Sequence, residues 1–201
     1  TDKELRNWQK SNPKEYAKWF YKRMEPIFLE KRAAVAESMQ ASVEDVPEWQ
    51  IKTPLQIAIQ ILKRHRDIYF QNDSDNKPVS IIITTLAAHA YKGEAELYDA
   101  LQNIVIDMPN YIKCINGKWA VMNPVADENF ADKWNEYPKR KDAFLNWLQK
   151  AQKDFTAAQD QKTLLESMTS LKPILGEKVI EKVASDFGIS IAFINLRICK
   201  K

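Results

Sequence analysis

The stretch Pro54 to Leu62, "PLQIAIQIL", would be apolar around almost its whole circumference if it were helical. Thr53 is a favourable N-cap, Pro54 suits a first helical turn, and no helix breaker follows before Asn72. The sequence therefore predicts a helix over residues 54–70. A helix that is apolar on all sides must be surrounded by other elements. We expect the chain to build its core around this segment.

Composition favours a largely helical protein. Only four glycines occur among 201 residues, and long amphipathic runs are separated by prolines, which is typical of helices joined by short turns. A hydrophobic content of 45% is enough for one large domain or two small ones. The two cysteines have no metal or redox spacing, and the sequence shows neither a signal peptide nor a long apolar span. These features predict a cytoplasmic protein that does not enter a membrane.

Helices are predicted over most of the chain. Asn12 and Pro13 begin a first long helix, whose aromatic stripe of Tyr16, Trp19 and Phe20 is expected in the core. Residues 77–93 are rich in β-branched side chains, yet their apolar positions repeat every three to four residues, which indicates a buried helix ending near Gly93. Further helices are expected over 94–107, from Pro138 onward, over 163–175 and over 177–187.

Two short segments break the helical pattern. The polar run 71–76 is predicted to be an exposed loop. Between Tyr111 and Met122, two short apolar runs flank Asn116 and Gly117, the preferred pair for a tight hairpin turn. The expected fold class is therefore mainly α, a helical bundle with one small β-hairpin.

Several familiar kinds of catalytic site are absent from the sequence. No nucleophile elbow, Walker loop or dinucleotide-binding glycine pattern occurs. His65 and His89, the only histidines, lie on separate predicted helices without a metal-ligand pattern, so structural roles are favoured for both. The acidic pair Asp73 and Asp75 lies in the polar loop, where a turn is favoured over a magnesium site because metal ligands need rigid support.

One basic cluster remains, in the segment "LKRHRDIYF" where the apolar helix ends. If the helices over 54–70 and 77–93 are antiparallel neighbours, this end lies beside the start of the second helix. Lys63, Arg64 or Arg66 could then share an anion with the Ser80 hydroxyl and the free amides of that helix's first turn. This geometry would suit a triphosphate.

On spacing alone, an ordinary role for these cations is favoured over an anion site. Basic side chains near a helix C-terminus complement the helix dipole, and Asp67 offers them a nearby partner. A net charge of +3, from 30 basic and 27 acidic residues, does not identify a nucleic-acid binder.

The ordered blocks "SNPKEYAKWFYKRM", "LQIAIQILKRHRDIYF", "KPVSIIITTLAAHAY" and "GKWAVMNPVADENFADKW" resemble the C-terminal portion of bacterial CD-NTases. These are the cyclic-GMP-AMP-synthase-like and DncV-like nucleotidyltransferases of antiphage signalling. The element "NPVADENFADKW" is similar to the "DP-x-x-P-x-x-N" segment of oligoadenylate synthetases. The resemblance covers most of residues 1–188 and implies the second, helical lobe of such an enzyme, followed by a tail over 189–201.

The catalytic lobe of that family carries a Gly-Ser turn and acidic residues that hold two magnesium ions. None of the four glycines here precedes a serine. The resemblance therefore implies that the magnesium ligands lie upstream of Thr1, in an N-terminal catalytic lobe. The chain is expected to be a fragment that is inactive alone.

The same resemblance implies which residues contact substrate. In such enzymes a lysine on the central helix and a serine opening the next helix contact the donor triphosphate, and Lys63 and Ser80 match those positions. Arg64 and Arg66 are weaker candidates, because neighbouring residues of one helix cannot all face one cleft. For Asn129 and Asp132 it implies a structural turn and cap.

The expected function is the C-terminal lobe of a cyclic-oligonucleotide synthase that binds nucleoside triphosphates and closes the active-site cleft. A regulatory protein is a further expected partner of this lobe. One alternative is a stand-alone module that binds a protein partner through Trp8, Trp19 and Phe20. The other is a nucleic-acid-binding domain. It would use the following basic and aromatic side chains: Lys139, Arg140, Lys141, Trp134, Tyr137 and Trp147.

Overall fold

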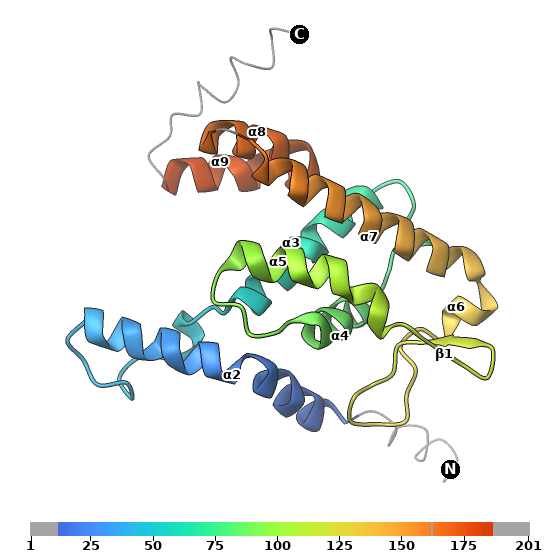
Figure 1. Ribbon diagram of the computed structural model, residues 1–201, viewed down its shortest axis with the longest axis horizontal. Coiled ribbons are helices and arrows are strands. Elements are labelled where there is room, and N and C mark those ends of the chain that lie inside the picture. Colours follow the sequence, from blue (N-terminus) through green and yellow to red (C-terminus); the bar gives the residue numbers. More distant parts are fainter. Residues whose placement is uncertain (1–11, 162, 187–201) are drawn as a thin grey trace, which may run out of the picture.

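The computed structural model describes residues 12–161 and 163–186, and these form a helical bundle with one β-hairpin (Figure 1). The helices are α2 (Pro13–Ser38), α3 (Pro54–Tyr69), α4 (Ser80–Ala90), α5 (Leu97–Asp107), α6 (Lys133–Glu136), α7 (Pro138–Gln159), α8 (Leu164–Leu175) and α9 (Glu177–Asp186). Two 3₁₀ turns, η1 (Glu48–Gln50) and η2 (Met108–Tyr111), and strands β1 (Lys113–Ile115) and β2 (Lys118–Ala120) complete the described fold. The expected fold class is confirmed. The expected tail over 189–201, and Trp8, lie outside the described residues.

Helix α3 has the central position that its apolar circumference predicts. Helices α3, α4 and α5 form the middle of the molecule, with α2 along one side and α7, α8 and α9 along the other (Figure 1). Thr53 caps α3 in a reciprocal arrangement: its hydroxyl accepts from the Gln56 amide, and its own amide donates to Gln56 Oε1 at 3.0 Å. This capping box fixes where the helix begins.

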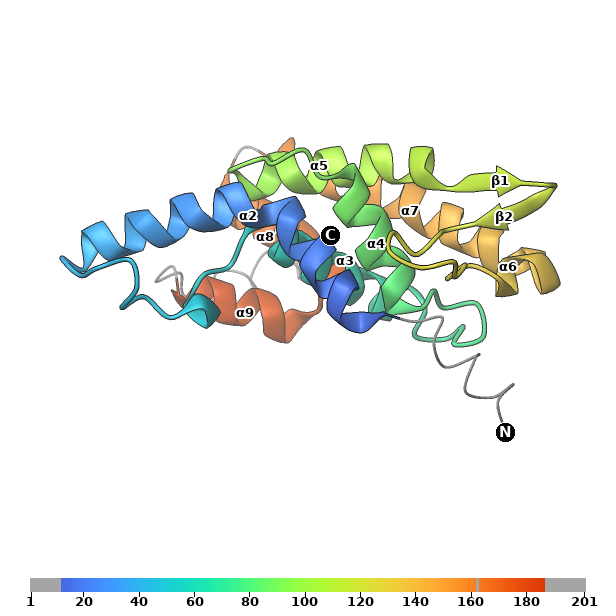
Figure 2. The same cartoon turned by 90° about the horizontal axis from the view of Figure 1, so that it is seen from below.

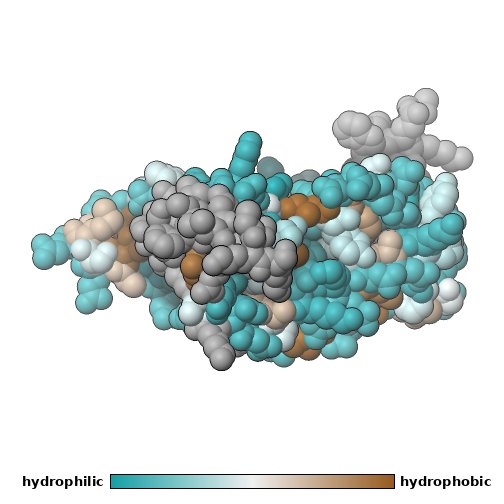
Figure 3. All heavy atoms as spheres, turned by 90° about the horizontal axis from the view of Figure 1, so that it is seen from above, coloured by the Kyte–Doolittle hydropathy of each residue, from teal (hydrophilic) through white to brown (hydrophobic). Residues whose placement is uncertain are grey.

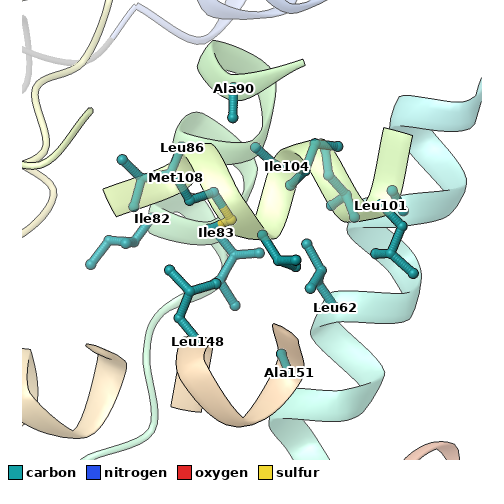
Figure 4. Close-up of a cluster of buried hydrophobic side chains, with 14 of the residues drawn as sticks. Leu62, Ile82, Ile83, Leu86, Ala90, Leu101, Ile104, Met108, Leu148 and Ala151 are labelled. Atoms are coloured by element: carbon teal, nitrogen blue, oxygen red, sulfur yellow. The ribbon is translucent and has the colours of Figure 1, made fainter. Parts of the chain in front are cut away.

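The core joins α3, α4, α5 and α7 (Figure 4). Leu62, Ile83, Leu86 and Ile104 are fully buried within it. Because the central helices exclude water from one another on several sides, burial of these side chains is the main source of stability at the centre of the bundle. A smaller apolar cluster of Phe28, Ala36, Val46 and Ile51 packs the segment after α2 against that helix.

Helix α4 ends at Ala90, three residues before the expected end at Gly93. Tyr91 is extended, with φ −65° and ψ 131°, and the guanidinium of Arg23 takes over the last carbonyls. It donates to the oxygens of Ala88 at 2.7 Å and Tyr91 at 2.8 Å. A side chain from α2 therefore ends the helix, where the sequence pattern had pointed to a local glycine cap.

The hairpin forms at the predicted pair. Asn116 and Gly117 both have positive φ angles, 50° and 75°, as a tight hairpin turn requires. The strands pair antiparallel, with Lys113 opposite Ala120. Figure 2 shows the hairpin at one end of the molecule and the C-terminal end of α2 at the other.

Within the described ranges, no helix is both long and apolar enough to cross a membrane. The face of the molecule in Figure 3 is mostly hydrophilic, with scattered apolar patches. This distribution agrees with a chain whose large apolar side chains are gathered in the core.

Candidate functional site

The end of α3 and the start of α4 lie together, as the sequence predicts. Arg66 Nη1 donates to Ser80 Oγ at 2.9 Å and to the carbonyl of Pro78 at 3.0 Å. The loop over 71–76 connects the two helices and is exposed except for half-buried Asn76. Two residues of the predicted anion site are therefore in direct contact.

Arg66 is committed to protein groups. Besides its two bonds to the start of α4, it donates from Nε and Nη2 to Asp67 Oδ1, at 3.0 and 2.7 Å. Four of its five N–H donors are thus occupied, and the residue is only 6% exposed. Arg66 holds the two helix ends in place, and it has little hydrogen-bonding capacity left for a ligand.

Ser80 differs from Arg66, because its hydroxyl and amide donors have no acceptor among the described residues. The residue is exposed, and its Oγ accepts from Arg66, so its own hydroxyl proton must point elsewhere. Val79 at the N-cap supplies no side-chain hydrogen bond. Among the described groups, none accepts from the amides of Ser80 and Ile81. An uncapped N-terminus with open amides favours a bound anion.

Lys63 lies one turn before Arg66 on α3, on the same side of the helix. Its side chain is half buried and makes neither a hydrogen bond nor an ion pair with the described part of the chain. Burial, together with the charge of Arg66, lowers the pKa of Lys63 below its usual value. A cation that has no partner among the described residues would be stabilised by an anion.

The site also contains a residue that the sequence did not single out, Lys77. Its Nζ lies 3.1 Å from Asp67 Oδ1, the same oxygen that accepts from Arg66. Partial burial raises the pKa of Asp67, but the hydrogen bonds and charges of Arg66 and Lys77 outweigh this effect and hold the pKa below its ordinary value. Asp67 is therefore an anion that already pairs with two cations of the site.

Comparisons with known proteins show what the chain is similar to. No family model matches the chain. A c-di-GMP synthase from Roseivirga ehrenbergii is 34% identical over 154 residues, which cover 74% of this chain and 39% of that protein. The CD-NTase CdnG of Bradyrhizobium diazoefficiens, solved in complex with GTP, superposes with a TM-score of 0.64 over 87% of this chain and 55% of CdnG, at 23% identity. The chain is CD-NTase-like.

The CD-NTase-like chain spans well under two thirds of either protein that it matches: 39% of the c-di-GMP synthase and 55% of CdnG. The similarity to CdnG shows a shared fold, and the identity to the c-di-GMP synthase relates the chain to cyclic-dinucleotide synthases by sequence.

Arg64 is separated from the other candidate residues of this CD-NTase-like chain. Its Nε donates to the carbonyl of Leu175 at 2.8 Å, at the C-terminal end of α8. A rotation of 100° per residue turns Arg64 away from the side of Arg66. The guanidinium therefore completes a helix C-terminus, as a basic side chain commonly does.

The two histidines have structural environments, as expected. His65 is buried and bonds both Trp147 and Asp154 through its ring nitrogens. His89 lies against Trp19 and stacks on Tyr111 with an interplanar angle of 17°. The structural roles expected for Asn129 and Asp132 are also confirmed: Asn129 Oδ1 accepts from two backbone amides, and Asp132 caps α6.

The features behind the two alternative functions are less favourable in the CD-NTase-like fold. Trp134 and Trp147 are 3% and 0% exposed, so neither offers a face on which a nucleic-acid base could stack. Trp19 and Phe20 pack against the core, which leaves less of their side-chain surface exposed for contact with a protein partner. Over the residues that the structure describes, no group of three His, Cys, Asp or Glu side chains could hold a metal ion.

Proposed function

We propose that this chain is the helical C-terminal lobe of a cyclic-nucleotide synthase and binds the triphosphate of a nucleoside triphosphate at the α3–α4 junction. In this proposal Lys63 supplies a charge, Ser80 donates its hydroxyl proton, and the amides of Ser80 and Ile81 complete the phosphate contacts. Arg66 positions Ser80 and does not bind the phosphates itself.

The observation that carries the proposal is the contact between Arg66 and Ser80, which places open donors of α4 beside the basic side of α3. Three unrelated types of donor, an ammonium group, a hydroxyl and main-chain amides, then lie on two adjoining helix ends. An extended polyanion is stabilised by several such donors. The GTP complex of CdnG, which has the same fold, supports a nucleotide as the ligand.

The chemical role follows from the charge of a triphosphate. Nucleotidyl transfer from one nucleoside triphosphate to a ribose hydroxyl of another releases pyrophosphate, whose negative charge increases as the bond breaks. Lys63 and the α4 amides would orient the β- and γ-phosphates and stabilise that charge. The described residues do not fit a metal site, so we assign magnesium binding to an N-terminal catalytic lobe, without which this lobe is inactive.

The wider setting is part of the same proposal. The chain would act in the cytoplasm, in antiphage signalling, with nucleoside triphosphates and the catalytic lobe as its partners. The relationship to a c-di-GMP synthase supports a cyclic dinucleotide as the product. A regulatory protein partner would be additional to these.

Titration of the chain with ATP or GTP, followed by NMR or calorimetry, tests the binding site. We expect weak binding that requires the triphosphate, with AMP and GMP binding less well. Lys63→Ala and Ser80→Ala should each weaken binding roughly tenfold, because each removes a contact to a charged group. Arg64→Ala should leave binding unchanged. If neither Lys63→Ala nor Ser80→Ala changes the affinity, the site is wrongly assigned.

A further inference from the structure

Lys77 and Asp67 form an ion pair beside the Arg66–Ser80 contact. Lys77 Nζ lies 3.1 Å from Asp67 Oδ1, with the two side chains 39% and 41% exposed. The same oxygen accepts from Arg66 Nε and Nη2. One carboxylate oxygen therefore serves two cations, of which one is buried and one is not.

The two halves of this arrangement differ in strength. The bond to Arg66 is a charge-assisted pair of N–H donors from a buried guanidinium whose Nη1 donors are also occupied. The bond to Lys77 joins two half-exposed groups through a flexible side chain, and such pairs contribute little to stability. Lys77 is accordingly the partner that can leave Asp67 at small cost.

Lys77 is also close enough to reach a ligand at Ser80. The two residues are three positions apart, so their Cα atoms lie at most about 11 Å from each other. The carbonyl of Pro78 between them is held by Arg66 at 3.0 Å, which ties this segment to α3. A phosphate chain bound at Ser80 would extend over several ångströms and lie within the range of the Lys77 side chain.

We propose that Lys77 is a further phosphate ligand. Without a ligand Lys77 pairs with Asp67, and a bound polyphosphate replaces Asp67 as its partner. This inference rests on the proposed function, because it needs an anion at Ser80. Asp67 remains on Arg66 throughout, while Lys77 exchanges one carboxylate oxygen for phosphate oxygens.

The exchange gives the site a preference for highly charged anions. A monophosphate carries about the charge of one to two carboxylates, so it gains little by replacing Asp67 as the partner of Lys77. A triphosphate offers more charge and more acceptor oxygens within reach of the same lysine. The contribution of Lys77 should therefore be large for triphosphates and small for monophosphates.

Inorganic tripolyphosphate tests this role without any contribution from a base or sugar. We expect Lys77→Ala to weaken its binding about three- to tenfold and to change the binding of inorganic phosphate little. Asp67→Asn should tighten binding, since the amide oxygen can still accept from Arg66 while the competing charge is gone. Lys92→Ala is the matched control, because Lys92 also pairs with an aspartate, Asp107 at 2.6 Å, but follows the other end of α4.

The double variant separates competition for Lys77 from a general effect of charge. If Lys77 carries the effect, Asp67→Asn tightens binding much less when Lys77 is already alanine. If Asp67→Asn tightens binding equally in both backgrounds, Lys77 does not exchange between Asp67 and phosphate and the proposal is overturned. A Lys77→Ala variant that binds tripolyphosphate as tightly as the parent would overturn it too. Loss of binding in Lys63→Ala and Ser80→Ala with no effect of Lys77→Ala would leave the proposed function standing and remove this inference alone. Thermal unfolding of each variant shows whether the fold is retained.

Discussion

Trp147 Nε1 donates a hydrogen bond of 2.9 Å to His65 Nδ1, which joins α7 to α3 in the interior of the bundle. An indole nitrogen can only donate, so His65 Nδ1 must accept and the ring proton must sit on Nε2. That proton is directed at Asp154 Oδ2, 3.0 Å away. The neutral ring therefore has a partner at each nitrogen.

Acid should destabilise the fold through His65. Burial lowers the pKa of His65 below its ordinary value, as does the charge of Lys150, although Asp154 opposes the shift. The unfolded chain then binds a proton at a higher pH than the folded chain, so stability is lost as pH falls below about 6.5. In urea unfolding between pH 7 and 5, His65→Gln should lose less stability than the parent.

His89→Gln is the matched control for that measurement. Burial, Arg23 and Lys113 also lower the pKa of His89, so this variant should remove only its own share of the pH dependence. If the stability of the parent and of His65→Gln falls in parallel as the pH is lowered, folding does not lower the pKa of His65 and the prediction is wrong.

Arg66 should matter far more for stability than Arg64, although the two are neighbours on α3. Arg66→Met leaves the Pro78 carbonyl and Asp67 without their buried donor, which we expect to cost about 2–4 kcal/mol. Arg64 is exposed and bonds one helix-terminal carbonyl, so Arg64→Ala should cost at most about 1 kcal/mol. Urea unfolding compares the two directly. Equal losses would contradict the assigned difference in their roles.

Asn129 should not tolerate replacement by aspartate. Its Oδ1 accepts from the amides of Val121 and Ala131 at 2.9 Å, and its Nδ2 donates to the Trp119 carbonyl at 3.0 Å. Asn129→Asp keeps the shape but turns a donor into an oxygen facing that carbonyl, which should cost about 1–3 kcal/mol. Thermal or urea unfolding measures the loss. Asn110→Asp, at an exposed position, should be nearly neutral.

The parts of the fold that the sequence predicts well are those decided by neighbouring residues. The capping box at Thr53 and the turn at Asn116 and Gly117 need only local chemistry, and both form where expected. The end of α4 could not be read in the same way. It depends on Arg23, which lies 65 residues before Ala88 and reaches it only in the folded chain.

The same distinction between local and long-range contacts applies to the candidate site. Helical spacing predicts that the end of α3 and the start of α4 meet if the two helices are antiparallel neighbours, and the direct contact between Arg66 and Ser80 is found there. Spacing could not show that Arg64 bonds a carbonyl 111 residues away, nor that Arg66 is saturated by protein groups. The pairing of Lys77 with Asp67 had a weak sequence signal, opposite charges flanking the loop.

Gly176 provides a test of the position assigned to Arg64. Its φ of +91° is unfavourable for any other residue, and a Cβ there would lie 2.5 Å from Arg64 Nη2. Gly176→Ala should therefore cost about 1–3 kcal/mol in urea unfolding, from backbone strain and from displacement of the guanidinium. In an Arg64→Ala background the steric part disappears, so the same substitution should cost less. An identical cost in both backgrounds would mean that the strain lies wholly in the backbone and that Arg64 does not pack against this turn.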